Sequence, residues 1–157
     1  MKEFSHINAQ NQPKMVDVST KIVTKRTATA QAIITLNNDI MAQFNGDDVH
    51  SKKGPVFQTA IIAGIQGVKK TSALIPMCHP LPIDGVEITL TPKQNSLYIR
   101  CTVSVEAKTG VEMEALTGAS ICALTVYDMC KSFSHDLRIH EVKLIEKKGG
   151  KSDISQK

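Results

Sequence analysis

The sequence predicts an α+β fold, a ferredoxin-like sandwich in which helices cover one face of a four-stranded antiparallel sheet. Apolar residues alternate at period two over several segments and recur at helical spacing over the segments between them. The predicted order is strand, helices, two strands, helix, strand, which is the order of the split βαβ arrangement. This fold hosts many functions, so it does not by itself indicate one.

Length and composition indicate one domain over residues 1–157, because 157 residues with 41% hydrophobic content can bury a full core. No apolar run is long enough to span a bilayer, and Met1–His6 lacks the apolar centre of a secretory signal. The four cysteines show no Cys-x-x-Cys spacing, which fits a reducing compartment. We therefore expect a cytoplasmic protein that does not bind membranes, with flexible polar ends at 1–14 and 149–157.

The first predicted strand covers residues 22–36, where small and apolar residues alternate with polar ones. Arg26 falls on the face of small residues, which leaves room beside its guanidinium. This arginine either pairs with an acid or meets a phosphate.

Two helices are predicted next. Asn37–Asp39 is a capping sequence for a short helix containing Ile40, Met41 and Phe44, which Asn45-Gly46 ends. After a polar loop over 47–53, Gly54-Pro55 opens a second helix whose apolar stripe ends at Val68. Glycine is costly inside a helix, so Gly64 and Gly67 predict close approach by another element. Lys69 and Lys70 lie at the C-terminal end of this helix, where they also suit the helix dipole.

The loop Leu74–Pro82 holds three prolines around Met77, Cys78 and His79. A metal site here is weakly indicated, because no second Cys or His lies at ligand spacing nearby. A Cys–His nucleophile pair is weaker still, because sequence neighbours seldom point at each other. The stiff loop either contacts a ligand or only packs and bonds locally.

The remaining strands are predicted over 86–91, 97–108 and 137–144. The first two form a hairpin joined by 92–96, and the second of them alternates almost without fault. In the last strand, the spacing of the apolar residues predicts a one-residue irregularity near His140-Glu141.

The longest helical pattern, residues 108–131, carries charge only at its ends. Glu112 and Glu114 lie at the front, whereas Asp128 and Lys131 lie at the back and share a local patch at i, i+3. Glu114 and Asp128 face similar directions but lie roughly 21 Å apart along the helix, so they cannot touch. If both ends serve one site, either the ligand is long or a second copy of the chain brings its helix end alongside, and we expect the second. We therefore expect a homo-oligomer.

The net charge of +4 is modest, but lysines cluster at 52–53, 69–70 and 147–151. These clusters are either a solvated surface or a polyanion pocket assembled in space. A basic ferredoxin-like module that binds RNA is the alternative function. It would present aromatic residues for stacking bases, whereas the chain has no Trp, two Tyr and four Phe. A purely structural role leaves the charged pair at 128 and 131 unexplained.

Several long motifs in one order resemble cyclic pyranopterin monophosphate synthase, accessory protein C of molybdenum cofactor biosynthesis. They are Met15–Ser19, Lys53-Gly54, Ile62–Gln66, Leu74–Leu81, Lys108–Leu116, Tyr127–Lys131 and Gly149–Ser152. The resemblance covers nearly the whole chain. It implies conversion of 3′,8-cyclo-7,8-dihydro-GTP to cyclic pyranopterin monophosphate with release of diphosphate.

The resemblance also implies roles for individual residues. Asp128 matches the catalytic acid, and Lys53 and Lys131 match essential lysines. Residues that match the two substrate-binding segments are Met77, Cys78, His79, Met113 and Glu114, and further pocket positions are Arg26, Lys69, Glu112 and Lys147. The family is a hexamer, a trimer of dimers with sites at subunit interfaces. We expect no tightly bound metal or cofactor, no nucleic acid partner, and a nucleotide-derived small molecule as substrate.

The chemistry needs such residue types. Rebuilding a purine as a pterin requires several proton transfers, and a lysine beside a carboxylate can exchange protons once burial shifts their pKa values. Loss of diphosphate requires cations on the leaving phosphates, which Arg26, Lys69 and Lys147 would supply.

Overall fold

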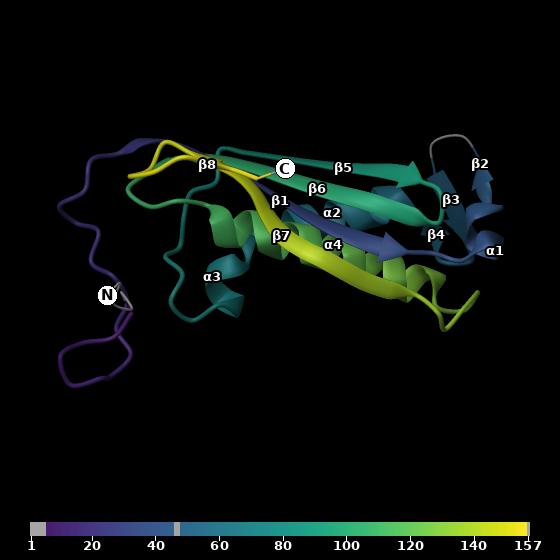
Figure 1. The fold of residues 1–157 in the computed structure, drawn as a ribbon, viewed down its shortest axis with the longest axis horizontal. Helices are drawn as coiled ribbons and strands as arrows, with labels where there is room; N and C mark the ends of the chain where they lie inside the picture. The colour runs from purple at the N-terminus through teal and green to yellow at the C-terminus, as the bar shows by residue number, and fades with distance from the viewer. Residues whose placement is uncertain (1–5, 46–47, 157) are drawn as a thin grey trace.

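The main sheet is antiparallel and has the strand order β5-β6-β1-β7-β8 in the computed structural model, which describes residues 6–45 and 48–156 (Figure 1). Its strands are β1 (Thr24–Thr35), β5 (Gly85–Lys93), β6 (Ser96–Ala107), β7 (Arg138–Lys148) and β8 (Ile154–Ser155). The predicted α+β class and antiparallel sheet are confirmed. The prediction of four strands is wrong, because the described residues form a fifth, short strand.

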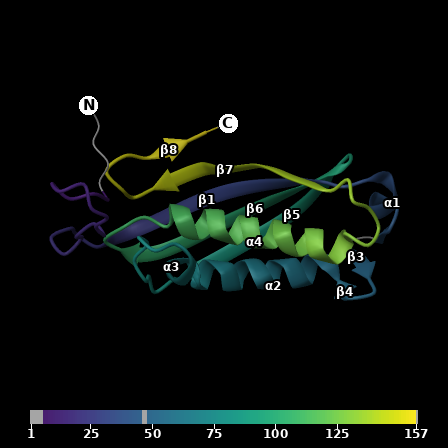
Figure 2. The same cartoon turned by 90° about the horizontal axis from the view of Figure 1, so that it is seen from below.

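Two long helices cover one face of this sheet. Figure 2 shows α2 (Val56–Lys69) and α4 (Glu112–Cys130) side by side beneath the strands. Two short helices, α1 (Asn38–Met41) and α3 (Thr71–Leu74), lie at opposite ends of the molecule. Among the described helices, none is both long and apolar enough to cross a membrane.

The core lies between the sheet and α4, as the alternation predicts. Ala28, Ala30 and Ala32 of β1 are almost fully buried, as are Ile99 and Val103 of the neighbouring strand β6. Short side chains on the central strand let the helix lie close to the sheet.

Glycines set the contact between α2 and α4. A Cβ added at Gly64 would lie 2.5 Å from Ile88 Cδ1 and 3.0 Å from the Gly118 carbonyl oxygen. A Cβ added at Gly118 would lie 2.6 Å from both Cys101 Sγ and Val68 Cγ2. Gly67 lies similarly close to α4. The predicted close approach at Gly64 and Gly67 is therefore confirmed.

The cysteines are free thiols. Burial raises the pKa of Cys101 and Cys122 to about 12 and that of Cys130 to about 11. These three are small core residues, as expected for most of the four. Cys78 is only half-buried.

The segment before α2 differs from the prediction. The short helix ends at Met41, and Phe44 belongs to a small strand, β2 (Phe44–Asn45). The predicted stop at Gly46 lies outside the described residues. The predicted polar loop contains β3 (Asp48–Ser51), which pairs with β2 and with β4 (Gly54–Pro55).

Asp48 explains why this loop folds as a strand. Its buried carboxylate accepts hydrogen bonds from the backbone N–H groups of Phe57 (2.8 Å) and Gln58 (3.3 Å). The residue at the N-cap of α2, Pro55, supplies no side-chain cap. Asp48 therefore caps the helix from outside, and this contact ties β3 to α2.

The irregularity predicted near His140-Glu141 is confirmed. The β1–β7 pairing shifts between Gln31 and Ile33, where β7 carries one extra residue, and Glu141 has a φ of 51°. Beyond β7, Asp153 Oδ1 accepts a hydrogen bond from Gly149 N at 3.0 Å, and β8 pairs with β7. The pattern does not predict β8, because two residues are too few to show a period.

Candidate active site

The C-terminal end of α4 carries a carboxylate held between two lysines. Lys53 Nζ lies 2.7 Å from Asp128 Oδ2, and Lys131 Nζ lies 2.9 Å from Asp128 Oδ1. Lys53 Nζ also donates a hydrogen bond to the Asp128 carbonyl oxygen at 3.2 Å. The predicted patch of Asp128 and Lys131 is confirmed, and the turn between β3 and β4 brings Lys53 to it. We call these three residues the Asp128 cluster.

The charges of the Asp128 cluster reinforce one another. Hydrogen bonds from Lys53, and then from Lys131, lower the pKa of Asp128 to about 2, and the hydrogen bond to Asp128 raises the pKa of Lys131. All three side chains are more than half exposed. Burial therefore does not bring these pKa values together within the single chain, because water still surrounds the cluster.

The opposite end of α4 borders a cavity of about 220 Å³. We call it the basic cavity, because its lining carries six cations and one acid; it consists of Lys21, Arg26, Thr27, Lys108, Thr109, Gly110, Glu112, Lys147, Lys148, Gly150 and Lys151. Six positive charges less one negative charge leave +5, which exceeds the +4 of the whole chain. Such a concentration of charge attracts polyanions.

Two of the predicted pocket residues meet directly in the basic cavity. Lys147 Nζ lies 3.1 Å from Glu112 Oε1, and both side chains are about 70% buried. Arg26 lines the same cavity, and its Nε is buried without a hydrogen-bond partner among the described residues. A buried donor without an acceptor costs roughly 1–3 kcal/mol, so the cavity is suited to a ligand that supplies one.

The loop with Met77, Cys78 and His79 lies near the start of α4, where α3 packs beside the helix (Figure 2). Glu114 is 4% exposed, and its pKa is raised, mainly by burial. Burial, and then the charge of Glu114, raises the pKa of the Cys78 thiol. His79 Nε2 lies 2.9 Å from the carbonyl oxygen of Val16.

The side chains of Lys69 and Met113 make no polar contact within the described part of the chain. Lys69 is exposed on the last turn of α2, and the Met113 side chain is 38% exposed on the first turn of α4. Both lie on the surface of the helical layer. Their predicted roles therefore depend on a ligand or on another copy of the chain.

Four lysines of the basic cavity were not among the predicted site residues: Lys21, Lys108, Lys148 and Lys151. Lys148 and Lys151 belong to the lysine cluster at 147–151, for which a polyanion pocket is one of the two interpretations of the sequence. No pattern indicated Lys21 and Lys108, because they are far apart in sequence and meet only through the fold.

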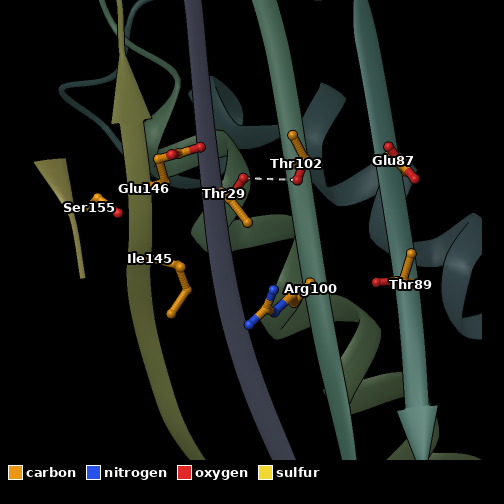
Figure 3. Close-up of a pocket in the computed structure, with 8 residues that line it drawn as sticks. All are labelled: Thr29, Glu87, Thr89, Arg100, Thr102, Ile145, Glu146 and Ser155. Carbon is orange, nitrogen blue, oxygen red and sulfur yellow. Dashed lines mark hydrogen bonds between the residues drawn. The ribbon is translucent and has the colours of Figure 1, made fainter. Parts of the chain in front are cut away.

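A second cavity, of about 320 Å³, lies on the face of the sheet that the helices leave open (Figure 3). Thr29 and Thr102 are joined there by a hydrogen bond of 2.9 Å and lie between Glu87 and Glu146, and Arg100 lies in the neighbouring row beside Thr89. None of the predicted site residues lines it. Carboxylates on both sides make it a poor anion site.

The geometry separates the predicted residues into two groups. The Asp128 cluster lies at one end of α4, and the basic cavity and the 77–79 loop lie at the other. Glu114 and Asp128 are roughly 21 Å apart along the helix axis. No group of three His, Cys, Asp or Glu side chains in the described ranges is placed to hold a metal ion.

Fold and site together define an α+β protein with a strongly basic cavity at one end of α4 and a carboxylate paired with two lysines at the other. The MoaC family matches residues 15–150, and the chain belongs to this family.

Two relatives that match along nearly their whole length are named cyclic pyranopterin monophosphate synthase. The one from Staphylococcus carnosus is 54% identical over 97% of this chain and 95% of its own length. The one from Xanthomonas campestris pv. campestris (strain B100) is 50% identical over 96% of this chain and 92% of its own length. Neither name supports the RNA-binding alternative.

Other relatives are longer. The chain is 50% identical to a molybdenum cofactor biosynthesis bifunctional protein of Synechocystis, of which it spans 46%. It is 49% identical to molybdenum cofactor biosynthesis protein 1 of Dictyostelium discoideum, of which it spans 27%. The chain thus spans half or less of these longer curated relatives.

Proposed function

We propose that this chain is a cytoplasmic cyclic pyranopterin monophosphate synthase, which converts 3′,8-cyclo-7,8-dihydro-GTP to cyclic pyranopterin monophosphate and diphosphate. The observation that carries the proposal is the pairing of a polyanion cavity with a lysine–carboxylate cluster, in a chain of the MoaC family. The names of its full-length relatives support the reaction. The β5-β6-β1-β7 order supports a ferredoxin-like description of the sheet.

The basic cavity binds the triphosphate in this proposal. Closing the cyclic phosphate forms a P–O bond at the α-phosphorus and breaks the bond to the β-phosphate, so negative charge develops on the departing diphosphate. Arg26 and Lys147 stabilise that charge, and Lys69 adds a cation from α2. Glu112 keeps Lys147 in place until the phosphates arrive.

The Asp128 cluster carries the proton transfers. Within one chain Asp128 stays ionised and Lys131 stays protonated at neutral pH, because each stabilises the charge of the other. Covering the cluster with substrate and protein would remove water and penalise the charged forms. A covered carboxylate flanked by Lys53 and Lys131 can then accept and return protons during pterin formation.

A complete site requires a second copy of the chain. Roughly 21 Å separates the carboxylates at the two ends of α4, so the Asp128 cluster of one copy is proposed to meet the basic cavity and the 77–79 loop of another. The helical layer offers a surface for this contact, because Ile62 on α2 is 60% exposed and Leu124 on α4 is 55% exposed. Apolar side chains exposed on adjacent helices are typical of an interface.

A hexamer built as a trimer of dimers needs two different interfaces on each chain. The open face of the sheet supports the second one. One row of aligned residues across it contains Glu87, Thr102, Thr29 and Glu146, and the next contains Thr89, Arg100, Gln31 and Lys143. The first row is acidic, through Glu87 and Glu146, and the second is basic, through Arg100 and Lys143. If two copies pack these faces together about a two-fold axis that runs between the rows, the acidic row of each copy lies on the basic row of the other.

The experiment is to mix the purified protein with enzymatically made 3′,8-cyclo-7,8-dihydro-GTP and to follow diphosphate and the pterin product together. We expect both from the wild-type chain and neither from Asp128→Asn. Release of diphosphate without pterin would contradict the proposed reaction. If neither forms from a well-folded oligomer, an RNA mobility-shift assay tests the alternative function, and native mass spectrometry measures the oligomer independently.

A further inference from the structure

We infer that the backbone carbonyl of Val16 holds His79 in the tautomer that carries its hydrogen on Nε2, which leaves Nδ1 as the proton acceptor of the 77–79 loop. Val16 thereby acts as a positioning residue. The tautomer follows from the geometry alone, and only the use of Nδ1 on the substrate rests on the proposed function.

The direction of the His79 hydrogen bond fixes the tautomer. The Val16 oxygen, 2.9 Å from Nε2, is a carbonyl and can only accept, so Nε2 must be the donor. In the neutral ring the other nitrogen, Nδ1, then carries a lone pair and no hydrogen. Within the described part of the chain, no hydrogen bond reaches Nδ1, which leaves it open to a ligand.

The backbone of the 77–79 loop has little freedom. Pro76, Pro80 and Pro82 restrict the backbone on both sides, and Cys78 N donates to the Ile75 carbonyl at 3.0 Å. On this restrained backbone, the hydrogen bond to Val16 orients the ring.

The Val16 carbonyl is itself held by the turn that follows it. Asp17 Oδ1 accepts from Ser19 N at 2.8 Å, and Lys21 N donates to the Val18 carbonyl at 3.1 Å. Lys108 Nζ, in the basic cavity, donates to the Ser19 carbonyl at 2.6 Å. The segment 16–21 therefore connects the His79 ring to the wall of the basic cavity.

The neighbouring thiol does not compete for the role of base. Cys78 is half-buried beside Glu114, and both burial and that charge favour the protonated thiol. In the step we infer, Nδ1 takes a proton from an N–H or O–H group of the substrate, which keeps the electron pair. The resulting imidazolium retains its bond from Nε2–H to Val16 and returns the proton later.

The first test is the nitrogen spectrum of the ¹⁵N-labelled full chain without substrate, recorded at alkaline pH. His79→Gln identifies the signals of this ring by their loss. We expect a protonated Nε2 and an unprotonated Nδ1. A ring with its hydrogen on Nδ1 would overturn the inference, whether or not the protein is an active synthase.

Three variants test the role of His79 as a proton acceptor and the role of the 16–19 segment in positioning its ring. His79→Gln keeps an amide donor for Val16 but no base, so we expect normal hydrogen-exchange protection at 16–19 and about a 100-fold loss of kcat. Asp17→Ala should speed exchange of the His79 Nε2 proton and lower kcat, and Asp17→Asn, which still accepts from Ser19, should restore both. A wild-type rate in His79→Gln, or no difference between Asp17→Ala and Asp17→Asn, would overturn the inference.

Discussion

The two ends of α4 present the same residue types in opposite surroundings. At the C-terminal end Asp128 is half exposed, touches two lysines and has its pKa lowered. At the N-terminal end Glu114 is 4% exposed, and burial raises its pKa. Exposure explains the opposite pKa shifts. Water and paired cations stabilise the ionised carboxylate of Asp128, whereas burial destabilises the ionised form of Glu114.

This comparison indicates which end is complete within one chain. The N-terminal end already has its covering loop, its cavity and its buried groups. The C-terminal end has its charges but no cover. Under the proposed function, the basic cavity of one chain and the Asp128 cluster of another come together where two chains meet.

The largest expected effect is at the uncovered end. Asp128→Asn and Lys131→Ala should each lower the rate of diphosphate release at least 100-fold, because each removes a group that the proton transfers need. Circular dichroism and native mass spectrometry should show an unchanged fold and assembly. Asp136→Asn, another exposed carboxylate, is the control and should keep the wild-type rate. Loss of assembly in Asp128→Asn would instead identify a structural ion pair.

The next effect is at the covered end. Arg26→Ala should lower kcat/KM about 10- to 100-fold, because hydrogen bonds to charged groups contribute about 1.5–3 kcal/mol. The matched control is Lys25→Ala, which removes a cation from the adjacent, outward-facing position of the same strand. Equal losses in both variants would mean that the total charge matters and the cavity does not.

Between the two ends, Gly118 keeps α4 against α2 and the sheet. Gly118→Ala should lower the free energy of unfolding by about 1–3 kcal/mol, because the new methyl group meets Cys101 and Val68. Urea unfolding measures the change, with the exposed Gln66→Ala as control. A free energy of unfolding equal to that of the wild type would contradict the prediction, because it would show that the surrounding side chains and helices can shift at no cost to accept the methyl group.

A smaller effect distinguishes the two carboxylates by pH. The folded-state pKa of Glu114 is raised above its ordinary 4.5, so its burial costs nothing below that pH and destabilises the fold as pH rises through the folded value. Glu114→Gln should therefore raise Tm at pH 8 and leave it unchanged at pH 4. An increase in Tm of equal size at both pH values would contradict the assigned cause.

The smallest effect is a change in titration alone. The carboxyl carbon of Asp128, followed by NMR, should titrate near pH 2, and Lys53→Ala should move that midpoint towards 3.8. Lys131→Ala should move it in the same direction, because the hydrogen bond and the charge of Lys131 also lower this pKa. Lys52→Ala, beside Lys53 but outside the cluster, serves as the control. A midpoint that stays unchanged in Lys53→Ala would contradict the contact between Lys53 Nζ and Asp128 Oδ2.

Local patterns alone predicted much of the fold. Alternation located β1, β5, β6 and β7, and helical spacing located α2 and α4, because these periods follow from backbone geometry. The pair Asp128 and Lys131 was predictable because it lies within one helical turn. Family motifs indicated the other candidate residues, whose catalytic and binding roles stay predictions.

Only the tertiary structure decided which distant residues meet. It placed Lys53 on Asp128, gathered Lys21, Lys108 and Lys151 around Arg26, and made Asp48 the cap of α2. It also decided that one end of α4 is covered and the other exposed. Such contacts depend on the path of the whole chain, whereas a sequence pattern reports only the geometry of neighbours.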